Sequence, residues 1–293
     1  LLAFVIAASV ATGSFAQELR CYTTEKHNEA IKNNPALIRQ MEELQKFTQE
    51  FGRTTRTSGV VYTIPVVFHI LHNYGPVNIF DAQIYDAMRI LNEDYRKLNA
   101  DTTSIVASFQ GIASDSEIEF RLATIDPNGN CTNGIDRIVT QLTYLAADPA
   151  KLNPWPNNKY LNIWVANSLE NTGAAAYAYY PGAAPTASVD GVMSRHNYVG
   201  SIGTSSSTGA RTLTHEIGHC FNLAHVWGST NQPGVACGDD LVTDTPETMG
   251  HTSCDLSSSV CNPPLIENVQ NYMEYSFCEH MFTQGQSARM RIA

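Results

Sequence analysis

The chain has 293 residues, of which 43% are hydrophobic and 16% are charged, and this ordinary globular composition excludes disorder as its main character. Its 18 Lys and Arg against 28 Asp and Glu give a formal net charge of −10, so nucleic acid and anionic membranes are poor candidate partners, because both require a basic face. The seven cysteines are an odd number that disulfides alone cannot account for.

The first residues predict export. Residues 1–11 are apolar but too few to span a bilayer, and Ser14 and Ala16 place small side chains where a signal peptidase reads them. We interpret residues 1–16 as a signal peptide, so that the mature protein is secreted to the extracellular space, the periplasm or the cell surface without a membrane span. The alternative is a buried N-terminal element. The sequence begins without Met or a basic leader, and we expect it to be incomplete there.

Residues 17–57 predict a pro-segment. Charged side chains are spread through helix-forming sequence, and Leu37, Met41 and Leu44 recur at the spacing of one amphipathic helix. A polar basic stretch at residues 53–59 follows, and such stretches are typical sites of proteolytic nicking. A charged helix between a signal peptide and a cleavable link is typical of a pro-segment that acts as an inhibitor of its own protein.

From about residue 58 the pattern predicts one larger folded unit. Residues 81–98 place Ile84, Met88 and Leu91 on one face of a helix. Apolar, β-branched segments predict strands at residues 60–71, 118–125, 134–140, 160–165, 174–179 and 191–196. This order of strand, helix, several strands and helix predicts an α/β (α+β) fold with a twisted mixed sheet.

The segment at residues 211–228 contains the candidate chemistry. His215 and His219 are four residues apart, so on a helix both imidazoles leave one face and can share a cation, and Glu216 lies beside them. His225 can reach the same ion after a turn. Three such ligands leave a fourth tetrahedral position open for water, which is typical of catalytic zinc.

Two further features extend this motif. Asn222 stands where the HExxHxxGxxH pattern has glycine, and asparagine is the non-glycine residue that best tolerates the positive φ required there. Downstream, Met273 and Tyr275 lie in the segment Asn-Tyr-Met-Glu-Tyr-Ser, which matches a methionine turn beneath zinc-binding imidazoles. Gap filling in the core is the alternative role for Met273, but it leaves the upstream histidines unexplained.

With these motifs the chain resembles the pappalysin family of metzincin zinc metalloproteases, in its cytophagalysin or ulilysin-like branch. Matching segments outside the zinc helix and methionine turn are residues 62–69, 159–164, 190–192, 237–246 and 281–283, with Gln286, Arg289 and Met290. The resemblance implies a metzincin catalytic domain over residues 58–293, with an upper subdomain to about residue 225 and a smaller irregular, disulfide-bonded lower subdomain at residues 226–293. It also implies a five-stranded sheet, an active-site helix and a backing helix.

The resemblance implies a zinc-dependent endopeptidase that hydrolyses internal peptide bonds of protein or peptide substrates. Zinc polarises the scissile carbonyl and activates a bound water, Glu216 acts as general base, and Tyr275 hydrogen-bonds the developing oxyanion. In the latent form, Cys21 of the pro-segment takes the open zinc position as a cysteine switch, although Tyr22 replaces the glycine usual in relatives. An incidental or disulfide-bonded Cys21 is the alternative.

Four of the cysteines cluster near the C-terminus, and none of them has the short spacing of a structural zinc knuckle. We therefore predict two disulfides, for which the sequence alone allows three arrangements. The resemblance implies the pairs Cys237–Cys261 and Cys254–Cys278. Cys220 is expected to be a small buried hydrophobic residue, and Cys131 has no assigned role.

The sequence leaves a calcium site and the cleavage preference unassigned. Hard oxygen ligands in one loop suit calcium, although a solvated acidic loop is equally consistent with them: Asp239, Asp240, Asp244 and Thr245. The acidic residue by which some relatives select arginine is missing or displaced after Tyr275, so no cleavage preference is predicted.

Three alternative functions also remain. A gluzincin would use Glu247 or Glu267 in place of His225, a secreted adhesin or binding module would keep the fold without catalysis, and a third possibility is a purely structural zinc.

Overall fold

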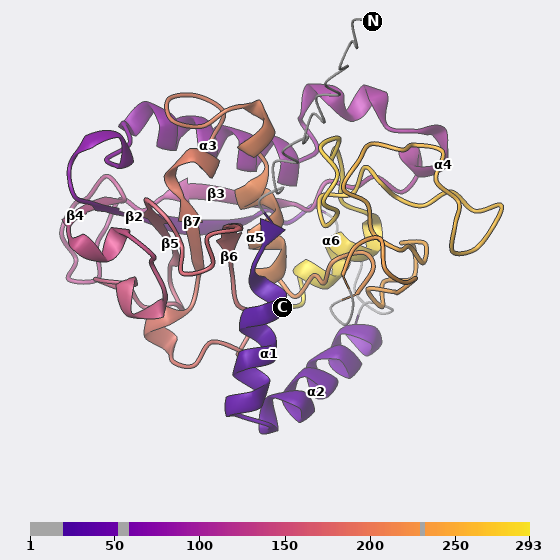
Figure 1. Cartoon of the computed structure of the whole chain (residues 1–293), viewed down its shortest axis with the longest axis horizontal. Coiled ribbons are helices and arrows are strands. Elements are labelled where there is room, and N and C mark those ends of the chain that lie inside the picture. Colours follow the sequence, from indigo (N-terminus) through magenta and orange to yellow (C-terminus); the bar gives the residue numbers. More distant parts are fainter. Residues whose placement is uncertain (1–19, 52–58, 229–231) are drawn as a thin grey trace, which may run out of the picture.

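The computed structural model describes residues 20–51, 59–228 and 232–293. The predicted signal peptide and most of the predicted cleavage stretch lie outside the described residues. The described chain begins with β1 (Arg20–Cys21), α1 (Thr23–Asn33) and α2 (Ala36–Phe51). Figure 1 shows α1 and α2 as an indigo pair at the bottom, to one side of the sheet.

Seven strands in the described part of the chain form one sheet, in the order β1-β6-β7-β5-β2-β3, with β4 also paired to β2. The strands after β1 are β2 (Tyr62–His72), β3 (Ile118–Leu122), β4 (Ile135–Val139), β5 (Leu161–Ala166), β6 (Ala174–Tyr177) and β7 (Val192–Arg195). Only β6 and β7 pair in antiparallel fashion; the other pairs in the sheet are parallel.

The predicted mixed α/β sheet is confirmed, and six of its strands lie where the sequence predicts them. The sheet is wider than the five strands that the resemblance implies. One reason is that β1 adds to its edge from the predicted pro-segment, and the other is that β3 and β4 share the same side of β2, one after the other.

The helices α3 (Asp81–Tyr95) and α5 (Thr212–Cys220) cover one face of the sheet and enclose the larger core. Alternation along β5 divides the two faces: Ile163 belongs to this core, whereas Trp164 belongs to a second cluster on the opposite face. Successive strand side chains therefore point toward α5 or away from it, and this alternation decides which residues of β1 can reach the metal centre.

The remaining helices are short. They are α4 (Ala107–Gln110), α6 (Gln284–Met290) and the 3-10 helices Gly75–Val77, Ala100–Ser104, Gln141–Thr143, Asp148–Ala150, Ala187–Val189, His196–Tyr198 and Ser207–Gly209. No helix within the described ranges is long and apolar enough to cross a membrane.

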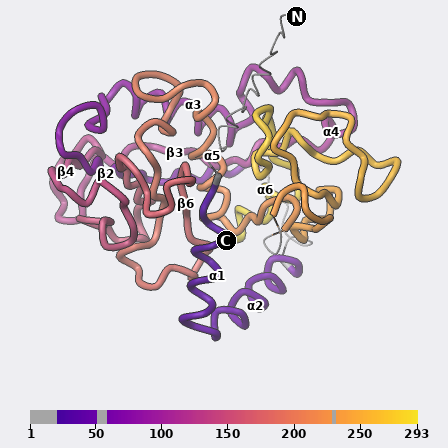
Figure 2. The backbone as a smooth tube through the Cα atoms, in the orientation of Figure 1, coloured from indigo at the N-terminus to yellow at the C-terminus, as the bar shows by residue number. Residues whose placement is uncertain are grey.

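After residue 225 the chain is mostly irregular, and its orange and yellow loops lie beside the sheet-containing part in Figure 2. Two disulfides cross-link this region, Cys237–Cys261 and Cys254–Cys278, each with a sequence separation of 24. These are the pairs that the resemblance implies. They stabilise a region that has little regular secondary structure.

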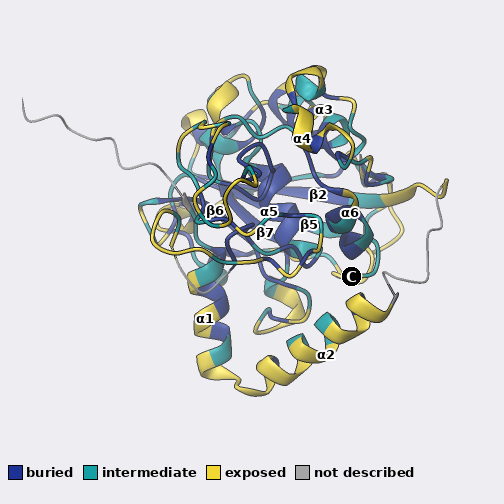
Figure 3. Cartoon of the chain, turned by 90° about the vertical axis from the view of Figure 1, so that its right-hand side faces the viewer, coloured by how far each residue is buried: buried dark blue, intermediate teal, exposed yellow. Residues whose placement is uncertain are grey.

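The predicted amphipathic helix is present as α2, but much of its surface is exposed (Figure 3). Leu37 is buried, whereas Ile38 and Phe47 remain 47% and 44% exposed. The preceding α1 buries more of its length and follows directly from β1, so the first helix of this segment makes the closer contact with the rest of the protein.

Candidate metal centre

The helix α5 presents His215 and His219 from one face because they are separated by about one helical turn. The helix then ends in a turn at Asn222, whose φ of 67° lies in the left-handed region. Asn222 is buried, and its carbonyl oxygen accepts a hydrogen bond from Nε of Arg289 at 2.6 Å. This turn brings His225 back toward the two helical imidazoles.

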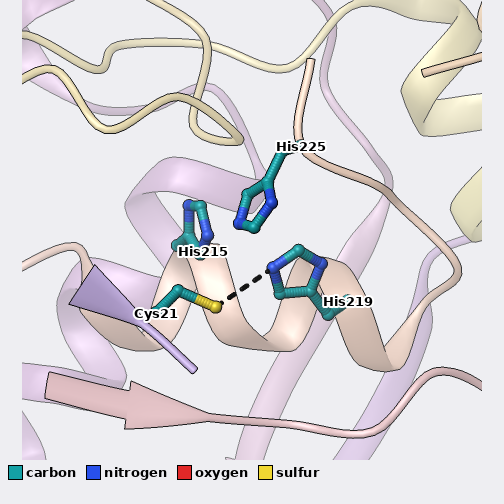
Figure 4. Close-up of side chains that lie close together, drawn as sticks. All are labelled: Cys21, His215, His219 and His225. Atoms are coloured by element: carbon teal, nitrogen blue, oxygen red, sulfur yellow. Dashed lines mark hydrogen bonds between the residues drawn. The ribbon is translucent and has the colours of Figure 1, made fainter. Parts of the chain in front are cut away.

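Four potential ligand atoms converge at this point, from Cys21, His215, His219 and His225 (Figure 4). All four atoms lie within 4.8 Å of one another. The three imidazoles are buried, and Sγ of Cys21 lies 3.5 Å from Nε2 of His219. The structure thus brings together the three predicted histidine ligands and the predicted pro-segment cysteine.

The hydrogen bonds of the helical imidazoles define which nitrogen faces the centre. Nδ1 of His215 donates to the Tyr272 carbonyl at 2.7 Å, and Nδ1 of His219 donates to the Leu223 carbonyl at 2.7 Å. Because a carbonyl oxygen only accepts hydrogen bonds, each Nδ1 carries the hydrogen and each Nε2 presents a lone pair. The Nε2 atoms of His215 and His225 are buried and have no hydrogen-bond partner among the described residues.

The protonation of the histidines agrees with this geometry. Burial lowers the pKa of His215 to about 4, and it lowers the pKa values of His219 and His225 well below the usual value. Neutral imidazoles with inward lone pairs are metal ligands, and three of them with a sulfur atom form a donor set that suits zinc. The residues therefore fit the metal that the motif implies.

Glu216 lies beside this cluster and is 1% exposed. Its Oε2 accepts hydrogen bonds from the Thr23 hydroxyl at 3.0 Å and from the Cys21 thiol at 3.4 Å. Burial raises the pKa of Glu216 to about 7 and raises the pKa of the Cys21 thiol well above its usual value. The segment that brings Cys21 to the histidines therefore also covers the candidate general base.

Tyr275 packs against His225, and Met273 packs against the histidine helix. The Tyr275 hydroxyl donates to the backbone carbonyl of Cys21 at 3.2 Å, and its ring centre lies 4.9 Å from that of His225. Met273 is fully buried, and a Cβ atom placed on Gly218 would lie 2.5 Å from its sulfur. The methionine turn therefore packs directly against α5.

Two contributing residues were not predicted from the sequence. Asp94 of α3 accepts hydrogen bonds from the Thr214 hydroxyl at 2.7 Å and the Tyr272 hydroxyl at 2.8 Å, and so joins α3, α5 and the methionine turn. Thr23 bonds Glu216 and also accepts a hydrogen bond from the Ala178 amide at 2.8 Å. No sequence motif surrounds Asp94. The only sequence feature that could have pointed to Thr23 is its position two residues after Cys21.

The candidate calcium residues are partly used by other contacts. Both carboxylate oxygens of Asp244 accept hydrogen bonds at the start of α6, from Thr283 at 2.7 Å and Gly285 at 2.8 Å. One oxygen of Asp240 accepts from the Val242 amide at 3.0 Å, and burial raises the pKa of Asp240 to about 7. Across residues 20–51, 59–228 and 232–293, only the cysteine–histidine cluster gathers three or more acidic, histidine or cysteine ligands.

The other predicted residues lie apart from the cluster. Glu247 is exposed, and Glu267 accepts hydrogen bonds from the amides of Val260 and Cys261, which places neither of them in the candidate metal centre. Three free cysteines are described: Cys21, Cys131 and Cys220. Cys220 packs against the larger core but is only partly buried, which is less than the sequence predicts, and Cys131 is exposed.

Comparison with known proteins gives one family and several relatives. The peptidase M43 family model, described as pregnancy-associated plasma protein-A, matches residues 144–293. An extracellular metalloprotease of Trichophyton verrucosum is 29% identical over 257 residues, covering 85% of this chain and 83% of the relative. One of Pyricularia oryzae is 28% identical over 293 residues, covering 97% of this chain and 91% of the relative.

Solved structures agree with these matches. Mature mirolysin of Tannerella forsythia, in complex with a cleaved peptide, is similar with a TM-score of 0.72 and 36% identity, covering 80% of this chain and 91% of that chain. A promirolysin mutant of the same organism is similar with a TM-score of 0.79 and 31% identity, covering 93% of this chain and 92% of that chain. The pro form thus matches a larger share of this chain than the mature form does.

Proposed function

Because the chain belongs to the peptidase M43 family of pappalysin metzincins, and is accordingly a metalloprotease, we propose that it is a secreted zinc endopeptidase made as a latent zymogen. The observation that carries this proposal is the convergence of three imidazole nitrogens and the Cys21 sulfur beside Glu216. A catalytic zinc site needs three protein ligands and a fourth position that can open to water, and this cluster offers both.

In this proposal His215, His219 and His225 hold the zinc ion. When bound, zinc supplies a Lewis acid that polarises the scissile carbonyl and makes water a better nucleophile at neutral pH. A gluzincin arrangement has no support, because neither Glu247 nor Glu267 belongs to the cluster.

Glu216 and Tyr275 would carry out the proton transfer and the stabilisation of the substrate carbonyl. Glu216 accepts hydrogen bonds from a hydroxyl and a thiol of the pro-segment, so its carboxylate can accept one from water once that segment leaves. It would then take the proton and deliver it to the departing amine. The Tyr275 hydroxyl already donates to a peptide carbonyl, that of Cys21, and a substrate carbonyl in the same place would receive the same hydrogen bond.

Strand β6 offers a binding edge for the substrate backbone. In the present form that edge is occupied, since β1 pairs with β6 and the Tyr22 amide donates to the Ala176 carbonyl at 2.9 Å. An extended peptide that replaces β1 can use the same backbone groups, as in other cases of strand addition. The pro-segment therefore competes with substrate for β6.

In this proposal two contacts of the pro-segment keep the zymogen inactive. Cys21 would supply a fourth ligand to the zinc ion, and the Thr23 hydroxyl donates to the oxygen of Glu216 that would otherwise accept from water. The larger share of this chain matched by the pro form than by the mature form supports a pro-segment over residues 17–57. We retain the division into a signal peptide at residues 1–16 and a catalytic domain at residues 58–293, with its two subdomains meeting near residue 225.

Secretion and calcium are further parts of the proposal. The relatives are named extracellular metalloproteases, which supports export. Within the described residues, Oδ2 of Asp240 is buried without a hydrogen-bond partner, which leaves one oxygen available for calcium near Asp244 and Thr245. A melting temperature that falls on calcium removal and recovers with Ca²⁺ but not Mg²⁺ would support this ion, and an unchanged melting temperature would contradict it.

The test of the function is Glu216→Gln in enzyme whose pro-segment has been removed by proteolysis after folding. We expect casein hydrolysis to fall by about two orders of magnitude or more, with bound zinc and melting temperature unchanged, because only the proton transfer is lost. Glu93→Gln on the surface of α3 is the matched control and should retain full activity. Casein hydrolysis by Glu216→Gln at the wild-type rate would contradict the mechanism, and stoichiometric zinc without any wild-type activity would favour a binding module.

A further inference from the structure

A group of acidic and aromatic side chains holds an ammonium group where the pro-segment crosses β6. Lys26 of α1 forms an ion pair with Glu170, although the lysine side chain is only 6% exposed. Its Nζ lies 5.2 Å from the centre of the Tyr177 ring. We call the four residues Glu170, Asp148, Tyr177 and Tyr179 the ammonium site.

The ammonium site is held together by contacts that do not involve the pro-segment. The Tyr177 hydroxyl donates to one carboxylate oxygen of Asp148 at 2.9 Å, and the Tyr179 hydroxyl donates to the other at 2.5 Å. Nζ of Lys151 lies 3.2 Å from the same carboxylate, and its side chain is fully buried. Three of the four side chains are therefore held in place without the pro-segment, and the backbone amide of the fourth residue, Glu170, donates to the Ala146 carbonyl at 3.0 Å.

Glu170 has a cation beside it only while Lys26 is present. Asp148 keeps Lys151 as its partner, whereas Glu29 of α1, which lies 3.7 Å from Lys26, leaves together with the pro-segment. Loss of Lys26 with the pro-segment leaves one net negative charge beside two aromatic rings. Carboxylates and aromatic faces together attract a cation more strongly than they attract a neutral side chain.

Along the extended pro-segment, the residue that faces the metal centre is followed directly by one that faces the ammonium site. Cys21 points toward His219, whereas the next side chain, Tyr22, points to the opposite face of the sheet and packs with Tyr177 at a ring distance of 6.2 Å. Nζ of Lys26 lies 5.8 Å from the Tyr22 ring. If a substrate peptide pairs with β6 as β1 does, a long side chain at the position of Tyr22 can therefore extend toward the place that the Lys26 ammonium group occupies.

We propose that, after the pro-segment leaves, the ammonium site binds a lysine or arginine side chain of the substrate. This basic residue is the immediate neighbour, along the substrate chain, of the residue whose side chain faces the metal centre. This inference rests on the proposed endopeptidase function. The long stems of lysine and arginine can cross the ring of Tyr177 and place the cation beside Glu170. Lys26 occupies in the zymogen the place that the substrate cation takes in the active enzyme.

The test compares activated wild-type enzyme with Glu170→Gln on matched fluorogenic peptides. Lysine, arginine, glutamine or norleucine is placed in turn at each position near the scissile bond, and kcat/KM is measured. We expect a basic side chain at one position to raise kcat/KM about fivefold over norleucine, as for a partly exposed ion pair, and high salt to reduce this ratio. In Glu170→Gln the ratio should fall to about one, with unchanged hydrolysis of uncharged peptides.

The control is again Glu93→Gln, which removes the same charge from the surface of α3 and should keep the preference. Peptide cleavage without any basic preference, or a preference that survives in Glu170→Gln, overturns the ammonium-site inference alone. A preference lost equally in Glu93→Gln overturns it as well, because overall charge would then be the cause. Absence of all peptide cleavage would instead contradict the proposed endopeptidase function on which it rests.

Discussion

Replacement of Gly218 by alanine tests the contact between α5 and the methionine turn. Gly218 precedes His219 in the helix, and an alanine Cβ would lie 2.5 Å from Sδ and 3.3 Å from Cε of Met273. Met273 is fully buried, so its sulfur has little room to move away. The same substitution in an exposed helix would be stabilising, because alanine is the better helix former.

The expected magnitude is the difference between these two effects. An overpacked core substitution costs about 1–3 kcal/mol, and the gain in helix propensity is about 1 kcal/mol. Because the overlap at 2.5 Å is with a fully buried sulfur, we place the cost in the upper part of this range, at about 2–3 kcal/mol. The net loss is then about 1–2 kcal/mol, which corresponds to roughly 2–8 °C in melting temperature for a domain of this size. Because the displaced sulfur lies beneath the ligand helix, the affinity for zinc should also fall.

The assay is thermal unfolding with zinc titration, with Gly111→Ala as the matched control. A Cβ on Gly111 meets no atom within 4 Å, and its φ is −73°, so this substitution should leave stability unchanged or slightly raised. Combining Gly218→Ala with Met273→Ala should cost less than the sum of the two single losses, because the smaller side chain makes room. A Gly218→Ala variant with wild-type stability and zinc affinity would refute the reasoning.

Three further predictions concern other elements. Cys21→Ala in the full chain should give a proform with measurable casein hydrolysis, and a proform as latent as wild type would count against the switch. Asn222→Ala should lower the melting temperature more than Asn222→Gly, because φ is 67° there; equal losses would show that the turn is not strained. A hydrogen bond to Glu274 raises the pKa of His251, so this stabilisation is present below about pH 6.5 and is lost as pH rises through the raised pKa. His251→Gln should therefore lower the melting temperature more at about pH 6 than at about pH 9, and a larger loss at the higher pH would contradict the pairing.

The strands were predictable where the local pattern is strong. β2 and β5 are long, apolar and β-branched, and they form the buried centre of the sheet. β1 has only two residues, and it is a strand because its backbone pairs with β6. No local signal marks such a strand, since its conformation depends on a partner far away in the sequence.

The metal centre shows the same division. The grouping of His215 and His219 follows from helical spacing, and that of His225 follows from the turn at Asn222, so three candidate ligands could be derived within one short segment. Asp94 joins the histidine helix to the methionine turn through buried hydrogen bonds, but an isolated aspartate in a helix has no distinguishing pattern. Only the packing of three elements around it reveals that role.

Cys21 could be predicted from the sequence only in part. It is 195 residues from Glu216, so no spacing rule connects them, and only the family resemblance singled out the cysteine. The structure adds that Cys21 does not act alone, since Thr23 bonds Glu216 and Lys26 bonds Glu170. These contacts share one chain with the site, so each is strengthened by the high effective concentration of the others. In the proposed zymogen, cleavage of the link would remove that advantage from every contact at once, so one proteolytic event would open the proposed metal position, the candidate general base and β6 together.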